Sequence, residues 1–126
     1  RDYQEESGTA YLFIAHDLSM VRYVSDEVGV MYLGQLVELC EAEEIYAHPL
    51  HPYTRGLLGA IPVANPKLAR QKVKSSIEGD IPSPIHPPSA CRFHTRCPFA
   101  TEKCKEEEPV LKNMGGGHLC ACHLYD

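Results

Sequence analysis

The chain has 126 residues and a mass of 14.1 kDa, with 44% hydrophobic and 23% charged residues. A chain of this length supplies at most one hydrophobic core of ordinary size, and its composition excludes a wholly disordered or fibrous protein. The net charge of −5 argues against a nucleic-acid-binding protein, which would need a basic surface. No apolar run approaches the roughly 18 residues that a membrane-spanning helix needs.

Proline, cysteine and charge are unevenly distributed along the chain. All ten prolines and five of the six cysteines lie after residue 48. Residues 1–48 carry ten acidic and two basic side chains, whereas residues 49–126 carry seven acidic and ten basic ones. Such a change in composition predicts two structural units.

The chain begins with a segment of helix-forming composition. Residues 1–6 are expected to form a helix that ends at Gly8, which tolerates a positive φ. This abrupt start predicts that the chain is part of a longer polypeptide. Residues 9–15 are continuously apolar and rich in aromatic and branched side chains, which is typical of a strand buried on both faces of a parallel sheet.

A helix and a hairpin are expected next. Residues 18–25 have apolar side chains at helical spacing, and Asp17 or Ser19 can cap the helix. Residues 28–33 read as a second buried strand, and residues 35–39 as a third strand that pairs with it across a glycine turn.

The pattern then becomes rich in prolines. Residues 41–46 predict a short acidic helix, and residues 52–61 a helix with proline in its first turn. From residue 62 to residue 88 a proline-rich connection follows, whose end, residues 81–88, is expected to be extended. This connection contains four cationic side chains, those of Lys67, Arg70, Lys72 and Lys74. We interpret them as part of a solvated linker; the alternative is that they contact a phosphate or a lipid.

His16 is the first candidate functional residue. It follows a predicted buried strand, and ligands of open parallel sheets bind beyond the carboxyl ends of the strands. By itself it is more simply read as a loop or capping histidine. Its surroundings, however, resemble the segment after the Walker B strand of ABC-transporter ATPases: Tyr11-Leu12-Phe13-Ile14-Ala15-His16-Asp17-Leu18 and Val30-Met31-Tyr32-Leu33-Gly34-Gln35-Leu36-Val37-Glu38. The resemblance implies that His16 is the switch-loop histidine, which contacts the γ-phosphate of ATP.

Later motifs narrow the resemblance to one subfamily. Five segments, in order, are similar to the region after the ATPase core of oligopeptide and dipeptide importers: residues 43–49, 51–58, 60–62, 78–84 and 91–100. The resemblance implies an α/β fragment, the C-terminal remnant of an ABC ATPase core followed by an irregular extension rich in proline and cysteine. Residues 1–51 would be the C-terminal part of the nucleotide-binding domain, and residues 52–126 the extension.

The same resemblance implies an energy-coupling subunit that binds ATP and Mg²⁺ at the cytoplasmic face of the membrane, as a peripheral protein. Its implied partners are a second ATP-binding subunit, the transmembrane permease subunits and, indirectly, a substrate-binding protein. The phosphate loop, the signature motif and the Walker B strand are missing from these residues. We therefore expect the 126 residues alone to be inactive as an ATPase, within a protein more than twice as long.

The cysteines form a second candidate site, at Cys91, Cys97, Cys104 and Cys122. In a cytosolic protein such a cluster favours a metal site over disulfides, and four thiolates can hold zinc or an iron–sulfur cluster. The spacing lacks the paired C-x2-C of a zinc ribbon. In the family that the chain resembles, these four positions are associated with a 4Fe-4S cluster; zinc, an empty reduced site and disulfides are the alternatives.

Other residues near the cysteines receive lesser roles. Three histidines could be ligands but are interpreted as bystanders, namely His94, His118 and His123. Arg92 and Arg96 could offset the charge of several thiolates. Cys120 lies where the family does not usually have a cysteine.

Two positions of the first half depart from the family. Cys40 is interpreted as a small turn or core residue. Ala42 stands where a serine or threonine would cap the helix that contains Glu43 and Glu44, so a loss of about 1 kcal/mol of local stability is expected.

A different class of function is the alternative. The chain could be a stand-alone metal-binding or electron-transfer module whose first half is only a scaffold. In either case, strand edges and an apolar face without a covering sheet predict self-association of the fragment.

Overall fold

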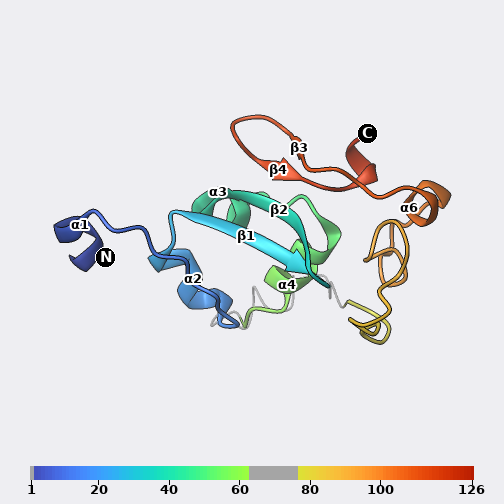
Figure 1. The fold of residues 1–126 in the computed structure, drawn as a ribbon, viewed down its shortest axis with the longest axis horizontal. Helices are drawn as coiled ribbons and strands as arrows, with labels where there is room; N and C mark the ends of the chain where they lie inside the picture. The colour runs from blue at the N-terminus through green and yellow to red at the C-terminus, as the bar shows by residue number, and fades with distance from the viewer. Residues whose placement is uncertain (1, 63–76) are drawn as a thin grey trace.

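The computed structural model describes residues 2–62 and 77–126, and its fold is α/β with a four-stranded antiparallel sheet of order β1-β2-β4-β3 (Figure 1). The four cations assigned to the linker, Lys67, Arg70, Lys72 and Lys74, lie outside the described residues. No helix within the described ranges is both long and apolar enough to span a bilayer.

The centre of the fold is a β-hairpin. Strand β1 (Glu27–Tyr32) pairs antiparallel with β2 (Gln35–Glu41), which confirms the predicted hairpin. Leu33 and Gly34 form the turn with φ of 46° and 80°, and glycine reaches this region at little steric cost. Strand β1 alternates between exposed and partly buried residues up to the buried Tyr32, so the prediction that residues 28–33 form a buried strand is wrong. An antiparallel hairpin places one face of each strand toward solvent.

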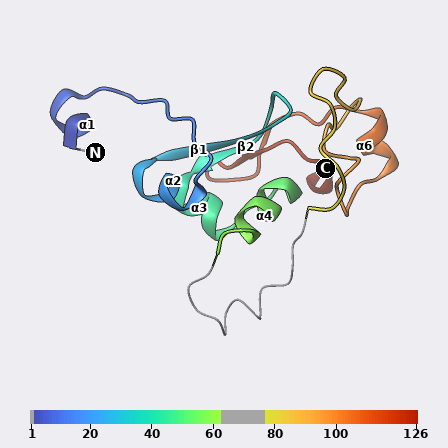
Figure 2. The same ribbon diagram turned by 90° about the horizontal axis from the view of Figure 1, so that it is seen from below.

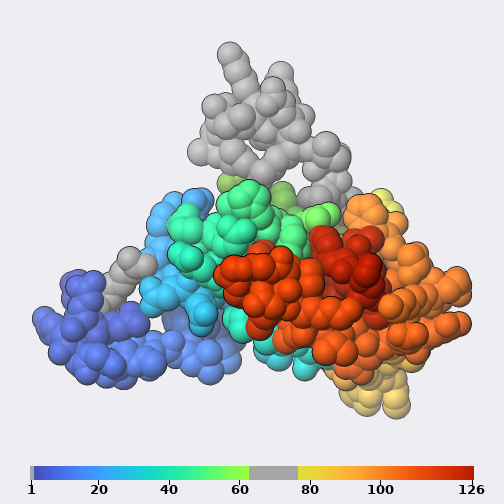
Figure 3. Space-filling view, turned by 90° about the horizontal axis from the view of Figure 1, so that it is seen from above, coloured from blue at the N-terminus to red at the C-terminus, as the bar shows by residue number. Residues whose placement is uncertain are grey.

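The C-terminal part of the chain completes this sheet. Strand β4 (Leu119–Cys120) pairs with β2, and β3 (Lys112–Asn113) pairs with β4 at the edge. The sequence does not predict these two-residue strands, because they are too short to show a periodic pattern. In the space-filling view the C-terminal residues lie against the central part of the chain, whereas the N-terminal residues lie at one end (Figure 3).

The first two helices agree with the sequence. Helix α1 (Asp2–Ser7) ends at Gly8, whose φ is +65°. Helix α2 (Leu18–Val24) is capped by Asp17, whose carboxylate accepts the backbone N–H of Ser19 at 3.0 Å. An aspartate at this position satisfies a backbone donor that the first turn leaves free.

Helices α3 (Ala42–Ala47) and α4 (Pro52–Gly59) also confirm predicted helices, and they lie on the same side of the hairpin in Figure 2. The cap of α3 is Glu41, whose side chain makes no capping hydrogen bond, and Ala42 is buried in the first turn. The expectation that a residue at position 42 would be the cap is therefore wrong. The hairpin extends through Glu41, so the helix can begin only after it.

Residues 9–15 do not form the predicted strand. They have no regular secondary structure, and the side chains of Leu12 and Ile14 are 95% and 87% exposed. A strand of a parallel sheet needs hydrogen-bonding neighbours, and none of the described strands pairs with this segment. The apolar pattern alone could not show whether such neighbours are present.

The remaining helices lie in the C-terminal part. Helix α6 (Glu102–Glu106) follows a loop, and the 3-10 helix η1 (His123–Tyr125) lies near the end of the chain. Residues 81–88, expected to be extended, contain no helix or strand.

The core joins the hairpin to this C-terminal part. Tyr32, Val37 and Phe93 are its buried members, and Tyr53 and Ile77 pack against them. The rings of Tyr32 and Tyr53 lie 4.7 Å apart, and that of Phe93 lies 5.2 Å from Tyr32 and 5.5 Å from Tyr53. Tilted ring pairs at these distances add to the stabilisation from buried area.

Candidate functional site

His16 lies at the exposed end of residues 9–15, directly before the cap of α2. Helix α2 lies at one end of the hairpin, and α6 at the other end of the molecule (Figure 1). The structure therefore does not bring His16 together with the cysteines. Within the described residues, its imidazole forms no hydrogen bond or ion pair.

The four predicted cysteines gather in the C-terminal part. The backbone N–H of Cys91 donates to the carbonyl of Cys104 at 3.0 Å, which brings the loop beside α6. Cys91 and Cys97 pack against the core around Phe93. Cys122, which follows β4, is close enough to Cys97, Cys91 and Cys104 for each to influence its ionisation.

Burial opposes ionisation of Cys91, Cys97 and Cys122. The pKa of Cys122 is raised to about 11, chiefly by burial and with a smaller contribution from the three neighbouring cysteines, against a lowering hydrogen bond from the Leu124 backbone. Burial likewise raises the pKa of Cys91 and of Cys97, partly offset by backbone hydrogen bonds. Thiols in this state are weak nucleophiles, so the arrangement does not favour a reactive cysteine.

These thiols are not arranged as metal ligands. Throughout residues 2–62 and 77–126, no group of three or more His, Cys, Asp or Glu side chains is positioned to hold a metal ion. All six cysteines are free thiols here. The donor set suits zinc or iron, but the geometry does not, and we derive no chemical step through a metal.

Cys40 and Cys120 are not among the four predicted ligands, although Cys120 lies close to Cys122. Both are buried in the sheet, which confirms the interpretation of Cys40 as a core residue. Burial raises the pKa of Cys40 to about 11 and raises that of Cys120 as well, and in both cases the nearby carboxylate of Glu38 adds to the effect.

The nearby histidines and arginines have other partners. Nδ1 of His94 lies 2.7 Å from the carbonyl of Cys91, and Nδ1 of His123 lies 2.6 Å from the carboxylate of Asp126. Arg92 donates to the carbonyl of Leu33 in the hairpin turn. Arg96 donates to the hydroxyl of Tyr32 at 3.5 Å and to the carbonyl of Glu78 at 3.4 Å. The two arginines therefore hold the cysteine loop against the hairpin.

Glu38 is a buried acid that the sequence reasoning missed. Its side chain is fully buried and accepts the backbone N–H groups of Leu50 and His51, both at 2.9 Å, and lies 2.5 Å from Nε2 of His118. His118 is thus part of this network and not of the cysteine group. The sequence did contain a signal for a buried acid, because Glu38 stands between the apolar residues Val37 and Leu39 in a predicted strand.

The end of the chain is held to the turn before α4. The hydroxyl of Tyr125 donates to the carbonyl of Leu50 at 2.6 Å and accepts from Arg55 at 2.8 Å. The backbone N–H of Ala121 donates to the carbonyl of Val37 at 2.9 Å. These bonds fix the segment that carries Cys122.

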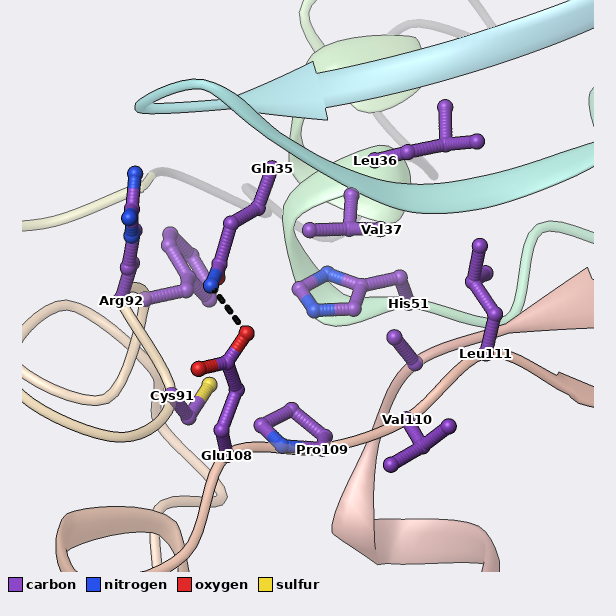
Figure 4. A pocket seen from close by; sticks show the side chains of 12 residues that line it. Gln35, Leu36, Val37, His51, Cys91, Arg92, Glu108, Pro109, Val110 and Leu111 are labelled. Atoms are coloured by element: carbon purple, nitrogen blue, oxygen red, sulfur yellow. Dashed lines mark hydrogen bonds between the residues drawn. The ribbon is translucent and has the colours of Figure 1, made fainter.

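A cavity of about 390 Å³ lies between the start of β2 and residues 108–111 (Figure 4). Gln35 donates to the carboxylate of Glu108 at 2.6 Å beside it, and Cys91 contributes to its wall. His51 also lines it; burial lowers the pKa of this imidazole to about 4, against the opposing charge of Glu38.

Comparison with known proteins gives the family. The sequence model of the oligopeptide/dipeptide transporter C-terminal region matches residues 37–104. This match covers more than half of the chain. The chain belongs to this family.

Individual relatives align with nearly the whole length of this chain. It is 50% identical over 122 residues to the oligopeptide transport ATP-binding protein AppF of Bacillus subtilis, covering 97% of this chain and 37% of AppF. It is 51% identical over 123 residues to the oligopeptide transport ATP-binding protein OppF of Salmonella typhimurium, covering 98% and 36%. The di/tripeptide transport ATP-binding protein DppF of Pseudomonas aeruginosa is 48% identical over 122 residues, covering 97% and 37%.

The chain thus spans little more than a third of the length of these relatives. All three are named as ATP-binding proteins of peptide transport. The alternative of a stand-alone metal-binding or electron-transfer module receives no support from these comparisons.

Proposed function

We propose that this chain is the C-terminal part of the ATP-binding subunit of an oligopeptide or dipeptide importer. The match of residues 37–104 to the transporter C-terminal region carries the proposal, and the names of the relatives support it. In this proposal residues 1–51 end the nucleotide-binding domain and residues 52–126 form the extension rich in proline and cysteine. The whole subunit binds ATP and Mg²⁺ and couples hydrolysis to transport.

The proposal places the subunit at the cytoplasmic face of the membrane, as a peripheral protein. Its partners there are a second ATP-binding subunit and the transmembrane permease subunits, with a substrate-binding protein acting indirectly. The relatives' names support these partners only through the class of transporter that they state.

His16 is proposed to sense the γ-phosphate of ATP in the whole subunit. Its exposed side chain is free to reach a ligand, and the capped helix α2 fixes the backbone that follows it. An imidazole N–H can donate a hydrogen bond to a phosphate oxygen, and this bond is lost when the phosphate leaves.

The test measures ATP hydrolysis by the full-length subunit with His16→Ala. We expect the rate to fall at least tenfold while ATP binding persists, because a donor aimed at developing phosphate charge acts mainly in the transition state. His86→Ala, an exposed histidine of the connection, is the matched control and should leave the rate unchanged. Equal rates for wild type and His16→Ala would contradict the role of His16. Magnesium-dependent turnover by the 126 residues alone would contradict their assignment as a fragment without the catalytic motifs.

The cysteine group is proposed to hold a 4Fe-4S cluster, with zinc as the alternative. The mutual influence of Cys91, Cys97, Cys104 and Cys122 supports a shared site, although their side chains are not in ligand positions in this structure. A bound metal would favour the thiolate form of these cysteines over the thiol form. It would also link the cysteine loop, α6 and the segment after β4 to one another.

Anaerobic purification of the full-length protein tests this proposal. We expect iron and sulfide in equal amounts and a visible absorption band, all lost in Cys97→Ser. Cys40→Ala removes a buried cysteine away from the group and should leave the metal content unchanged. Stoichiometric zinc without iron would overturn the iron–sulfur assignment.

A further inference from the structure

The cavity beside β2 contains a hydrogen-bond donor without an acceptor. His51 lines the cavity and is only 1% exposed. Its Nδ1 accepts the backbone N–H of Tyr53 at 3.0 Å, so the neutral ring carries its proton on Nε2. Across the described part of the chain, Nε2 makes no hydrogen bond. Figure 4 shows the ring projecting into the space between the strand that carries Val37 and the segment that carries Leu111.

The ring is neutral at physiological pH. Burial lowers the pKa of His51 to about 4, so the imidazole presents one N–H and no charge. An N–H group that faces a largely apolar cavity and has no protein acceptor gains free energy when a ligand supplies one.

The walls of the cavity are mainly apolar. Val37, Phe93 and Ala121 are buried around it, and Leu36, Val110 and Leu111 complete its apolar surface. A volume of about 390 Å³ falls in the range of small-molecule sites, which combine apolar walls with a few placed polar groups.

The surroundings of the cavity disfavour an ionised ligand. The carboxylate of Glu38 accepts the backbone N–H of His51, and Glu108 lines the cavity next to Gln35. Glu108 and Arg92 carry opposite charges at the cavity wall, and the apolar walls disfavour any ion because it would lose its hydration there. The guanidinium of Arg92 donates to the neutral carbonyl of Leu33 and keeps its positive charge.

We propose that this cavity binds a small, neutral, apolar molecule with a carbonyl group, whose oxygen accepts a hydrogen bond from Nε2 of His51. The apolar part of the ligand contacts Val37, Phe93 and Leu111. Binding is noncovalent and does not depend on ATP.

Three ligands of equal size test the chemistry: acetophenone, benzoate and α-methylstyrene. In the isotopically labelled full chain, acetophenone should shift the backbone amide NMR signals of Val37, Phe93 and Leu111 in a saturable way. Benzoate should bind at least tenfold more weakly because its carboxylate would lose hydration against the apolar walls. The hydrocarbon, which lacks the acceptor, should bind about fivefold more weakly, as expected for one neutral hydrogen bond. No saturable shift, or equal binding of benzoate, would overturn the proposal.

Two variants locate the site. Val110→Trp fills the cavity from an exposed wall position and should abolish the shifts, whereas Ile85→Trp, at a similarly exposed position outside the cavity, should not. His51→Asn keeps an acceptor for Tyr53 but withdraws the Nε2 donor, so acetophenone should lose its advantage over α-methylstyrene. Retention of that advantage would show that His51 is not the donor. If His51→Asn fails to fold, the paired tryptophan variants decide the location of the site.

Discussion

At the scale of single residues, Glu38 connects three segments that are far apart in the sequence. Its buried carboxylate receives backbone N–H groups from the turn before α4 and lies against His118 next to β4. A buried carboxylate is tolerated only where donors replace water, and here they come from both halves of the chain. Glu38 therefore fixes how the C-terminal hairpin sits on β2.

Glu38→Gln tests this connection. The amide keeps the shape of the side chain but places an N–H group where backbone donors need an acceptor, so we expect a loss of about 2 kcal/mol or more in unfolding free energy. Glu27→Gln, an exposed position of the same hairpin, should change it by less than about 0.5 kcal/mol. Urea denaturation measures both, and equal midpoints for the two variants would contradict a structural role of Glu38.

His51 makes stability depend on pH. Its pKa is 6.5 in ordinary surroundings and about 4 in the fold, because burial disfavours the charged ring. As pH falls, the unfolded chain gains this proton first, so the stabilisation is complete above pH 6.5 and is lost as pH falls to 4. The loss is about 3 kcal/mol over this window. Denaturation at several pH values measures how the unfolding free energy changes with pH, and this change should be smaller for His51→Asn than for the unmodified chain. An equal change in both would contradict the role of His51 in the pH dependence.

At the scale of elements, α4 shows how packing reverses a local preference. Gly56 lies inside this helix, where alanine would be favoured by about 1 kcal/mol. A Cβ at position 56 would, however, lie 2.4 Å from Cγ1 of Ile77, which packs against the core. The glycine is needed because residues after the connection cross the helix at close range.

Gly56→Ala should therefore destabilise the protein by about 1–3 kcal/mol, the usual range for overpacking. In an Ile77→Ala background the same change should be neutral or stabilising, since the obstructing atoms are gone and helix propensity remains. A double-mutant cycle by thermal denaturation measures the coupling. Additive effects would show that Ile77 does not restrict position 56.

The elements that the sequence predicted are those with local causes. Asp17 caps α2, Gly34 permits the hairpin turn, and Pro52 begins α4, each through its own backbone or side-chain chemistry. Strands β3 and β4 have no such local signal, because they form only by pairing with β2. The gathering of the cysteines and the cavity at His51 likewise depend on contacts between distant segments.

At the scale of the whole molecule, one sheet contains strands from the acidic first part and from the cysteine-rich last part. The core around Phe93 and the bonds of Tyr125 to the turn before α4 reinforce this union. The apolar residues 9–15 are the exception, since they lie exposed at one end of the molecule.

This exposed segment predicts self-association of the 126-residue chain. Burying the side chains of residues 9–15 against a second copy removes apolar surface from water. Replacing Leu12 and Ile14 by lysine should lower the apparent mass in concentration-dependent light scattering. Replacing Ile81 and Ile85, which are also exposed, is the control and should leave association intact. A monomer at high concentration for the unmodified chain would contradict the prediction.

The amino-acid sequence by itself determined the family resemblance, most of the helices and the central hairpin, because motifs, caps and turn residues act over a few neighbouring positions. Tertiary structure decided that residues 9–15 are not a strand, that Glu38 is buried with His118, and that His51 faces a cavity. Those outcomes depend on which distant segments are present to supply hydrogen bonds and apolar contacts, and no local pattern carries that information.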